Sequence, residues 1–262
     1  MKITIITVSY NSSHTLRDTM ESVLCQGYTN YEYIVVDGAS KDGTIDLIRE
    51  YEPRFEGRMR WVSEPDEGIY DAMNKGIAMA TGDVIGLLNS DDFYSSGDIL
   101  EMIANEFLRL NAPDAIYGDV HYVDELDTTK TIRYYSSRKF TPRHMPMGYM
   151  PAHPSFYVRR ECYEKYGTFD TSFCVAADFE NLLRLIYVHK IRTRYVNRDF
   201  VTMRMGGASS SGISSYLRIA ADHFNAFKKN GVSPSYILYF LRYAKKLFEF
   251  SRKHREQIRT GK

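Results

Sequence analysis

The chain has 262 residues, of which 44% are hydrophobic and 26% charged, so a packed core is expected and wholesale disorder is not. This length allows one large α/β domain with an extension, or two small domains. The net charge of +1 gives no sign of a polyanionic partner, and nucleic acid binding is not expected. The three cysteines, at 25, 162 and 174, are widely spaced without a C-x-x-C pair, which disfavours a disulfide framework or a zinc site.

Charge is distributed unevenly along the chain. Residues 216–262 carry a net charge of +8, and residues 1–215 carry −7. Such asymmetry suggests that the tail meets an anionic surface. Residues 1–10 hold an apolar run too short for a signal peptide, and no run approaches the roughly 18 apolar residues that span a bilayer. We therefore expect a cytoplasmic protein, peripheral at the inner face of the cell membrane.

Strands and helices are predicted to alternate over the first ninety residues. Buried strands are predicted from β-branched, apolar runs at 3–8, 33–36, 59–63 and 84–88. Amphipathic helices are predicted from apolar residues at helical spacing in 16–24, 44–51 and 69–80. This order favours right-handed βαβ units in an α/β fold with a mostly parallel sheet.

The fourth predicted strand ends in two adjacent carboxylates, Asp91 and Asp92. Ligands bind at the carboxyl edge of open α/β sheets. Two neighbouring carboxylates stay ionised together beside a counter-charge such as a divalent cation. The alternative is a solvated turn that caps the helix expected from residue 97.

Other polar residues follow the second strand and lie on the third helix. Asp37 opens a polar loop at 37–44, a layout that brings a carboxylate close to a nucleoside or forms an Asx-rich turn. Asn74 and Lys75 lie beside the apolar stripe of their helix, where a lysine either meets a phosphate or stays solvated. The chain has no G-x-G-x-x-G after the first strand and no G-x-x-x-x-G-K-[ST], which disfavours dinucleotide and P-loop chemistry.

The second half mixes strands, helices and loops. A helix is predicted at 97–110, antiparallel strands at 115–123 and 131–135, and another strand at 192–203. Residues 138–151, with three prolines and three methionines, are expected to form a loop over the acceptor side. A Gly/Ser loop at 206–212 either wraps a phosphate or links two elements.

Asp178 opens a predicted helix with apolar residues on one face. An aspartate at this position is a natural helix cap. A helix N-terminus also stabilises an ionised carboxylate, so Asp178 is expected to accept a proton at neutral pH.

Four consecutive motifs resemble the signatures of glycosyltransferase family 2; they lie at 7–11, 36–44, 69–76 and 89–92. The nearest resemblance is to bacterial enzymes that assemble exopolysaccharide or O-antigen repeat units. It implies the GT-A fold, with a nucleotide-binding half and an acceptor half. It also implies a hexosyltransferase-type enzyme that inverts the donor sugar and uses Mg²⁺ or Mn²⁺. The expected donor is a UDP-sugar, and the expected acceptor is a saccharide, lipid-linked during cell-surface polysaccharide synthesis.

The resemblance also implies roles for residues of the donor site. Val8, Tyr10 and Asp37 would hold the base of the donor. Asn74 and Lys75 would lie near its diphosphate.

The remaining implied roles concern the metal and the acceptor. Asp91 would contact the ribose or the metal, and Asp92 would be a further metal ligand. Asn89 stands where the family has the first acid of its D-x-D motif, so the division of roles between the two aspartates stays open. Asp178 would be the catalytic base, and His153 would be a site residue on the acceptor side, although a hydrogen-bonded structural histidine is the alternative.

Residues 213–262 are expected to form a basic helical extension to a glycosyltransferase domain of residues 1–212. One helix is predicted at 213–230 and a second from Pro234. A basic amphipathic helix favours an anionic membrane surface. The alternative is packing on the catalytic domain or on a second subunit of a homodimer.

Two other functions share some of these features. A nucleotidyltransferase also uses a metal at the sheet edge, but it would need a Gly-rich loop with Arg and Lys where this chain has residues 10–13. A catalytically silent nucleotide-sugar-binding scaffold would have no use for the acids at 91, 92 and 178.

Overall fold

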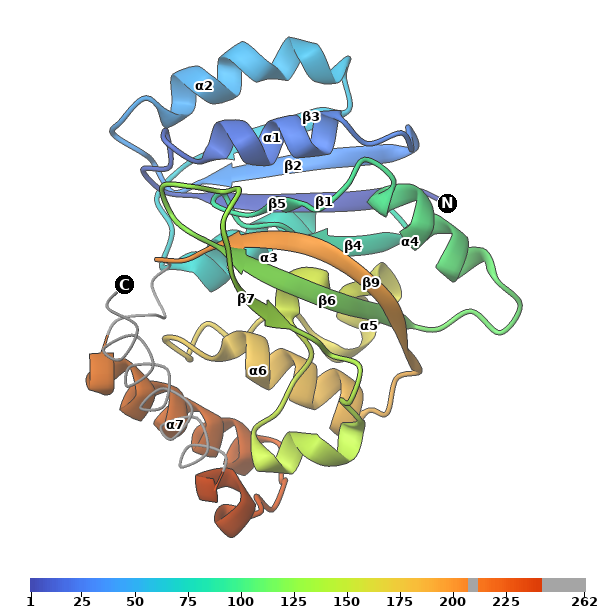
Figure 1. Ribbon diagram of the computed structural model, residues 1–262, viewed down its shortest axis with the longest axis vertical. Coiled ribbons are helices and arrows are strands. Elements are labelled where there is room, and N and C mark those ends of the chain that lie inside the picture. The colour runs from blue at the N-terminus through green and yellow to red at the C-terminus, as the bar shows by residue number, and fades with distance from the viewer. Residues whose placement is uncertain (207–211, 242–262) are drawn as a thin grey trace.

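The computed structural model describes residues 1–206 and 212–241. These residues form a nine-stranded sheet with the order β3-β2-β1-β4-β8-β6-β9-β5, and β7 pairs with β6 outside this path. Figure 1 shows the helices around this sheet, with α6 and α7 together at one end of the molecule.

The first half of the sheet is parallel, as the sequence predicts. Its strands are β1 (Ile3–Ser9), β2 (Tyr31–Asp37), β3 (Met59–Ser63) and β4 (Val84–Leu87). The connecting helices are α1 (Leu16–Leu24), α2 (Thr44–Tyr51) and α3 (Ile69–Met79), and a 3₁₀ turn at Glu52–Phe55 follows α2.

The second half of the sheet is mixed. Its strands are β5 (Phe93–Tyr94), β6 (Ala115–Val123), β7 (Thr131–Tyr135), β8 (Tyr157–Arg159) and β9 (Thr193–Arg204). The antiparallel pairing of β6 with β7 is confirmed. Since β8 is antiparallel to both β4 and β6, and β9 is parallel to β6, strands β1 to β4, β6 and β9 all end at the same edge of the sheet. We call this the carboxyl edge.

The helices of the second half are less regular than the sequence predicts. They are α4 (Ile99–Leu108), α5 (Arg160–Tyr166), α6 (Ala177–Leu182) and α7 (Gly212–Lys229). A π-helical turn at Leu183–Val188 continues α6. The expected loop over 138–151 contains a 3₁₀ helix at Pro142–Met147, and another follows at His153–Ser155.

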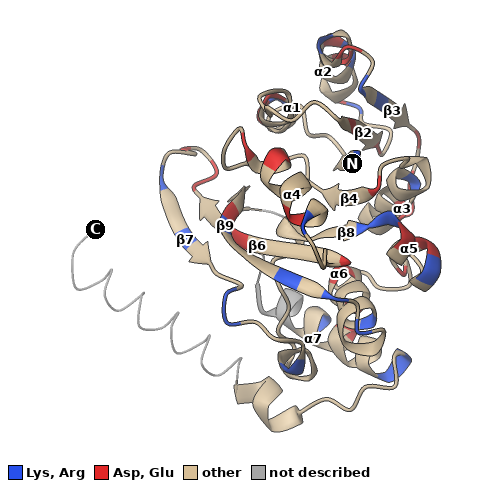
Figure 2. Ribbon diagram, turned by 90° about the vertical axis from the view of Figure 1, so that its right-hand side faces the viewer, with Lys and Arg blue, Asp and Glu red and all other residues tan. Residues whose placement is uncertain are grey.

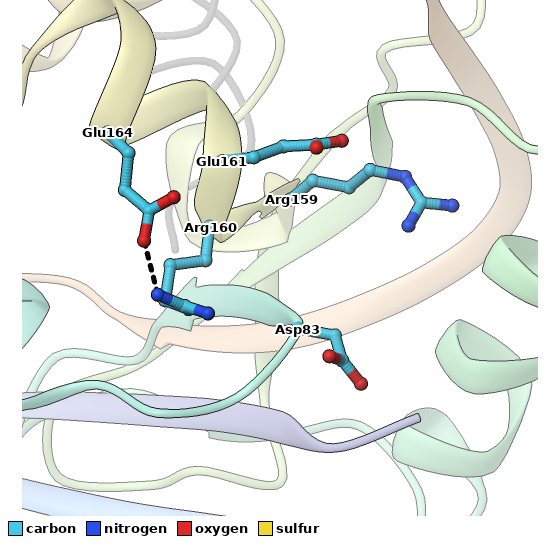
Figure 3. A pocket seen from close by; sticks show the side chains of 5 residues that line it. All are labelled: Asp83, Arg159, Arg160, Glu161 and Glu164. Carbon is cyan, nitrogen blue, oxygen red and sulfur yellow. Dashed lines mark hydrogen bonds and ion pairs between the residues drawn. The ribbon is translucent and has the colours of Figure 1, made fainter.

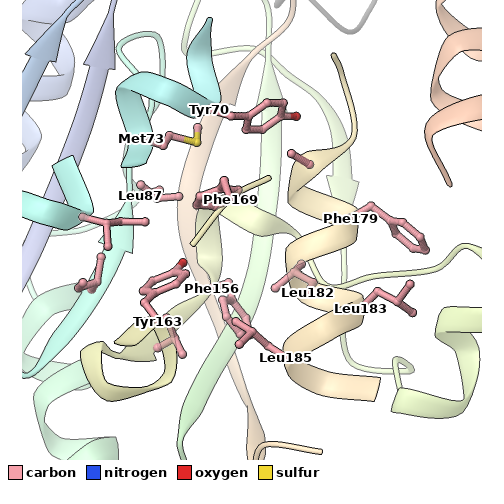
Figure 4. Packing of buried hydrophobic residues seen from close by; sticks show 14 of the residues in the cluster. Tyr70, Met73, Leu87, Phe156, Tyr163, Phe169, Phe179, Leu182, Leu183 and Leu185 are labelled. Atoms are coloured by element: carbon pink, nitrogen blue, oxygen red, sulfur yellow. The ribbon is translucent and has the colours of Figure 1, made fainter. Parts of the chain in front are cut away.

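Alternating strand residues divide the core into two clusters, one on each face of the sheet. In β1, Ile3 and Ile5 join the cluster with α1, α2 and α4, whereas Ile6 and Val8 join the cluster with α3, α5, α6 and α7. Figure 4 shows side chains of the second cluster meeting between α3, β4, α5 and α6. Each fully buried aliphatic or aromatic side chain contributes roughly 1.5–3 kcal/mol. The packing fixes the elements that carry the site.

The first part of the C-terminal extension packs on the domain. Ala226, Phe227 and Tyr239 are at most 1% exposed and belong to the same cluster as α6. Residues 236–241 are helical, and most of their side chains are exposed. In the part of the chain that the structure describes, no helix is both long and apolar enough to cross a bilayer. Residues 207–211 of the expected Gly/Ser loop at 206–212, and the basic segment from residue 242, lie outside the described residues.

Candidate active site

The acidic turn after β4 lies at the carboxyl edge. Asp91 is partly buried, and Asp92 is only 1% exposed, with Asn89 Nδ2 donating to Asp92 Oδ2 at 3.3 Å. Burial raises the pKa of Asp91, because desolvation penalises the charged form. Burial, and then the charge of Asp91, raises the pKa of Asp92 well above its usual value. Asp91 is therefore the more accessible carboxylate of the two.

Arg204, the last residue of β9, binds the backbone of this turn. Its Nη1 donates to the Asp91 carbonyl at 3.0 Å, and its guanidinium pairs with Asp18 of α1. Its charge lowers the pKa of Asp91 and of Asp92 against the effect of burial. Arg204 was not predicted from the sequence, although a cation at the end of a strand that reaches the carboxyl edge was a usable signal. Thr19 also supports the turn by donating to the Asp92 carbonyl at 2.7 Å.

Asp178 and His153 come together at this edge. His153 Nδ1 lies 3.3 Å from Asp178 Oδ2, and both side chains are partly buried. Leu87, the last residue of β4, lines the same small cavity as His153 and Asp178, so the pair lies beside the strand that leads into the acidic turn. Asp178 is not the N-cap of α6, which is Ala176; it lies in the first turn of the helix, where its Oδ1 accepts the N–H of Phe179 at 2.8 Å.

Helix α7 supplies the cap that α6 lacks. Asp222 Oδ2 accepts the backbone N–H groups of Val175 at 3.0 Å and Ala176 at 3.2 Å. The ring of His223 stacks on Phe179 with centroids 3.8 Å apart. The extension therefore positions the helix that carries Asp178.

Asp37 is enclosed at the end of β2. It is 0% exposed and accepts from Ser9 Oγ at 3.1 Å, Ser40 N at 2.9 Å and Ser63 Oγ at 2.7 Å. Ser40 Oγ also donates to it at 2.5 Å. In this structure the carboxylate of Asp37 organises its own loop. At the end of the neighbouring β1, the ring of Tyr10 is 63% exposed.

Three further residues expected in the donor site have structural contacts. Val8 is 7% exposed and belongs to the core. The Asn74 side chain exchanges two hydrogen bonds with the backbone of Phe169, at 2.8 and 2.9 Å. Lys75 Nζ donates to the Pro65 carbonyl at 2.8 Å. Asn74 thus links α3 to the segment before α6, and Lys75 links α3 to the loop after β3.

Two hollows differ in their relation to this site. A cavity of about 10 Å³, roughly the space of one water, is lined by His153, Asp178 and Asn181 together with aliphatic and aromatic side chains. A hollow of about 270 Å³ lies at the opposite edge, where β4 begins, and charged side chains line it (Figure 3): Asp83, Arg159, Arg160, Glu161 and Glu164. Arg160 and Glu164 form an ion pair across it. This hollow is remote from the acidic turn.

This geometry is that of a GT-A glycosyltransferase, in which a nucleotide-binding sheet carries its acids at the carboxyl edge. The chain belongs to a particular family of this class: the model of glycosyl transferase family 2 matches residues 4–176. The expected family and class of enzyme are thereby confirmed, and the scaffold and nucleotidyltransferase alternatives lose their support.

Two mycobacterial relatives match most of the chain. A glycosyltransferase of Mycobacterium tuberculosis is 32% identical over 207 residues, which are 78% of this chain and 76% of the relative. A PGL/p-HBAD biosynthesis glycosyltransferase of Mycobacterium bovis is 26% identical over 193 residues, covering 74% of this chain and 73% of that protein.

Solved structures share the fold at lower identity. S. aureus TarS 1–349 in complex with UDP-GlcNAc gives a TM-score of 0.67 at 18% identity over 85% of this chain and 66% of that one. The match spans only 43% of the longer TarS chain. A mannosyltransferase from Pyrobaculum calidifontis in complex with GDP-Man and Mn²⁺ gives 0.60 at 16% identity, covering 97% of this chain and 82% of that one. The predicted GT-A fold is confirmed.

Proposed function

We propose that the protein transfers a sugar from a UDP-sugar to a hydroxyl of a saccharide acceptor, in one displacement that inverts the anomeric carbon. The observation that carries this proposal is the contact between His153 and Asp178 beside the end of β4, the strand that leads into the acidic turn with Asp91. A direct displacement needs a base for the acceptor and charge stabilisation for the leaving diphosphate, and it needs no enzyme nucleophile. The bound UDP-GlcNAc in TarS and GDP-Man in the archaeal mannosyltransferase support a nucleotide-sugar donor.

Asp178 is the proposed base. It takes the proton of the acceptor hydroxyl while the acceptor oxygen bonds to the anomeric carbon and the bond from that carbon to the diphosphate oxygen breaks. Such general base catalysis contributes typically about 10²–10⁴-fold. With Nδ1 protonated, His153 donates to Asp178 Oδ2 and fixes the direction of the carboxylate.

The acidic turn fits Mg²⁺ or Mn²⁺ held jointly with the donor. Magnesium binds through one or two carboxylates plus substrate phosphates and waters, so a cluster of three protein ligands is unnecessary. None occurs among the described residues. Asp91 is the more accessible of the two carboxylates, and a cation would stabilise its partly desolvated charge. Asp92 is buried inside the turn. A bound cation would neutralise charge on the departing diphosphate.

Within the donor site, we propose that Asn74 and Lys75 act mainly through the segments that they anchor. Lys75 holds the loop at 64–66, and Asn74 holds the segment before α6. Both residues lie on α3. Their side chains can bind a diphosphate only if they first release these contacts.

The C-terminal extension gives the proposed location. Exposed apolar side chains gather on the helical turn at 236–241: Tyr236, Ile237, Leu238, Phe240 and Leu241. The sequence that follows carries eight Lys or Arg against two acids. An apolar surface beside a basic segment fits the anionic inner face of the cell membrane, where a lipid-linked acceptor is presented.

Vesicle flotation tests this location. The full chain should float with phosphatidylglycerol vesicles and lose that binding in high salt, whereas a chain ending at residue 241, which keeps α7, should bind more weakly. If the full chain stays unbound and has the mass of a dimer in light scattering, a second copy covers the apolar turn and the membrane proposal is wrong.

Release of free nucleotide tests the reaction. The full chain, with Mn²⁺, is incubated with UDP-, dTDP- and GDP-sugars, and slow transfer to water is followed as nucleotide diphosphate. We expect release from UDP-sugars that EDTA abolishes. Release unaffected by EDTA would remove the metal from the proposal, and no release from any donor would contradict the activity.

A further inference from the structure

Asp66 occupies the space where a side chain at position 38 would stand. A Cβ built on Gly38 would lie 2.4 Å from Asp66 Oδ2 and 3.3 Å from Cδ2 of the Tyr10 ring. No real Cβ tolerates the first distance, so a larger residue at 38 would displace the carboxylate. Gly38 directly follows β2 at the carboxyl edge. The loop after β3 thus approaches the end of β2 closely at Gly38.

The loop that carries Asp66 is held on both sides. Glu64 N donates to the Asp37 carbonyl at 3.0 Å, and Lys75 Nζ donates to the Pro65 carbonyl at 2.8 Å. Gly68 N donates to Asp66 Oδ1 at 2.9 Å. One carboxylate oxygen is therefore engaged within the loop, and the other, Oδ2, is directed at Gly38.

The two acids beside β2 present different atoms to a ligand. Asp37 is fully buried under three serines, whereas Asp66 is partly exposed. Among the described residues, no hydrogen-bond donor contacts Asp66 Oδ2. The exposed ring of Tyr10 lies next to it and offers a flat apolar face. A single acceptor beside an aromatic ring suits a planar heterocycle with one N–H.

We propose that Asp66 is the residue that selects the base of the donor. Its Oδ2 accepts a hydrogen bond from the ring imide N–H of uracil or thymine. This assignment rests on the proposed function and supplies the contact that would select its donor base. Cytosine and adenine present a ring nitrogen lone pair that a carboxylate repels, and guanine presents two adjacent donors that suit two free carboxylate oxygens. A site that holds a hydrogen-bond acceptor against the base rejects a base that lacks the matching donor.

Two variants and one control test the proposal by calorimetric titration of the full chain with UDP, CDP and GDP in the presence of Mn²⁺. Asp66→Asn should weaken UDP binding at least tenfold and reverse the order of UDP and CDP. The reversal is expected because the carbonyl oxygen of the new amide side chain keeps the hydrogen bond from Gly68 N. The amide N–H then faces Gly38, where the base would lie. Gly38→Ala should weaken UDP binding while the acid is retained. Glu67→Gln, the same chemical change on an exposed neighbour, should bind like wild type.

The outcomes separate this inference from the proposed function. UDP binding by Asp66→Asn within twofold of wild type, with an unchanged thermal midpoint, would overturn the role of Asp66 alone. Tighter binding of GDP than of UDP by wild type would contradict both the role of Asp66 and the UDP-sugar donor, and would leave only sugar transfer from another nucleotide sugar. Failure of wild type to bind any nucleoside diphosphate would contradict the proposed function and this inference together.

Discussion

His153 Nδ1 lies 3.3 Å from Asp178 Oδ2, although 25 positions separate the two residues in the chain. The contact forms because the 3₁₀ turn at His153–Ser155 and the start of α6 both reach the carboxyl edge. An imidazole that donates to a carboxylate fixes its direction and stabilises its charge. The pair thus gives a proton acceptor a defined orientation.

His153→Gln should slow transfer by roughly tenfold, because Asp178, the proposed catalytic base, would be less well oriented. The KM for the donor should stay nearly unchanged. The measurement is kcat and KM for UDP-sugar turnover across pH. His189→Gln is the matched control, since His189 stacks on Tyr166 away from the site. Equal effects of the two substitutions would show that the histidine acts only through stability.

Arg204→Gln should raise the Mn²⁺ concentration needed for half-maximal turnover by at least about threefold. Without this cation the pKa of Asp91 rises further above its ordinary value, so protons compete better with the metal. The increase should therefore be larger at pH 5.5 than at pH 7.5. Arg198→Gln, on the same strand but in an exposed pair with Asp98, should leave the metal requirement unchanged. A metal requirement that does not change in Arg204→Gln would contradict the positioning role.

Asp222→Asn should lower both thermal stability and kcat. The substitution weakens the cap on α6, and lost helix caps cost about 1 kcal/mol. Donor binding should change by less than twofold, because the main contact of α7 among the described elements is with α6. Unchanged turnover in a destabilised variant would show that α7 supports the fold without orienting Asp178.

Glu32→Gln should destabilise the fold by about 2–3 kcal/mol at neutral pH, by linkage to its lowered pKa. Despite opposing desolvation, hydrogen bonds from Lys2, Thr4 and Thr81 lower the pKa of Glu32 from 4.5 to about 2. A lowered pKa means that the native state holds fewer protons than the unfolded chain. The advantage of wild type is therefore complete above pH 4.5 and disappears as pH falls toward about 2. Urea unfolding at several pH values measures it, with the exposed Glu50→Gln as control.

The parallel half of the sheet was predictable because each strand is a continuous β-branched run bounded by turn residues. Strands β5 and β8 span two and three residues, too few to show a periodicity, and they are specified by pairing with β9, β4 and β6. The π-helical turn after α6 likewise has no signal in residue spacing.

The residues of the candidate site were predictable where they lie in a recognisable sequence motif, as Asp91, His153 and Asp178 do. The surroundings of those residues were not. The cap of α6 comes from Asp222 on a distant helix, and the space above Gly38 is filled from another loop, by Asp66. Both contacts depend on tertiary packing, which local patterns do not encode. The functional roles of all these residues stay predictions.

Turnover of the full-length Asp178→Asn variant tests the central claim most directly. Asparagine keeps the size of the side chain and removes its ability to take a proton. We expect UDP affinity within twofold of wild type and release of UDP from a UDP-sugar slowed by about 10²–10⁴-fold. A variant that binds UDP normally and turns over at the wild-type rate would show that another group removes the acceptor proton.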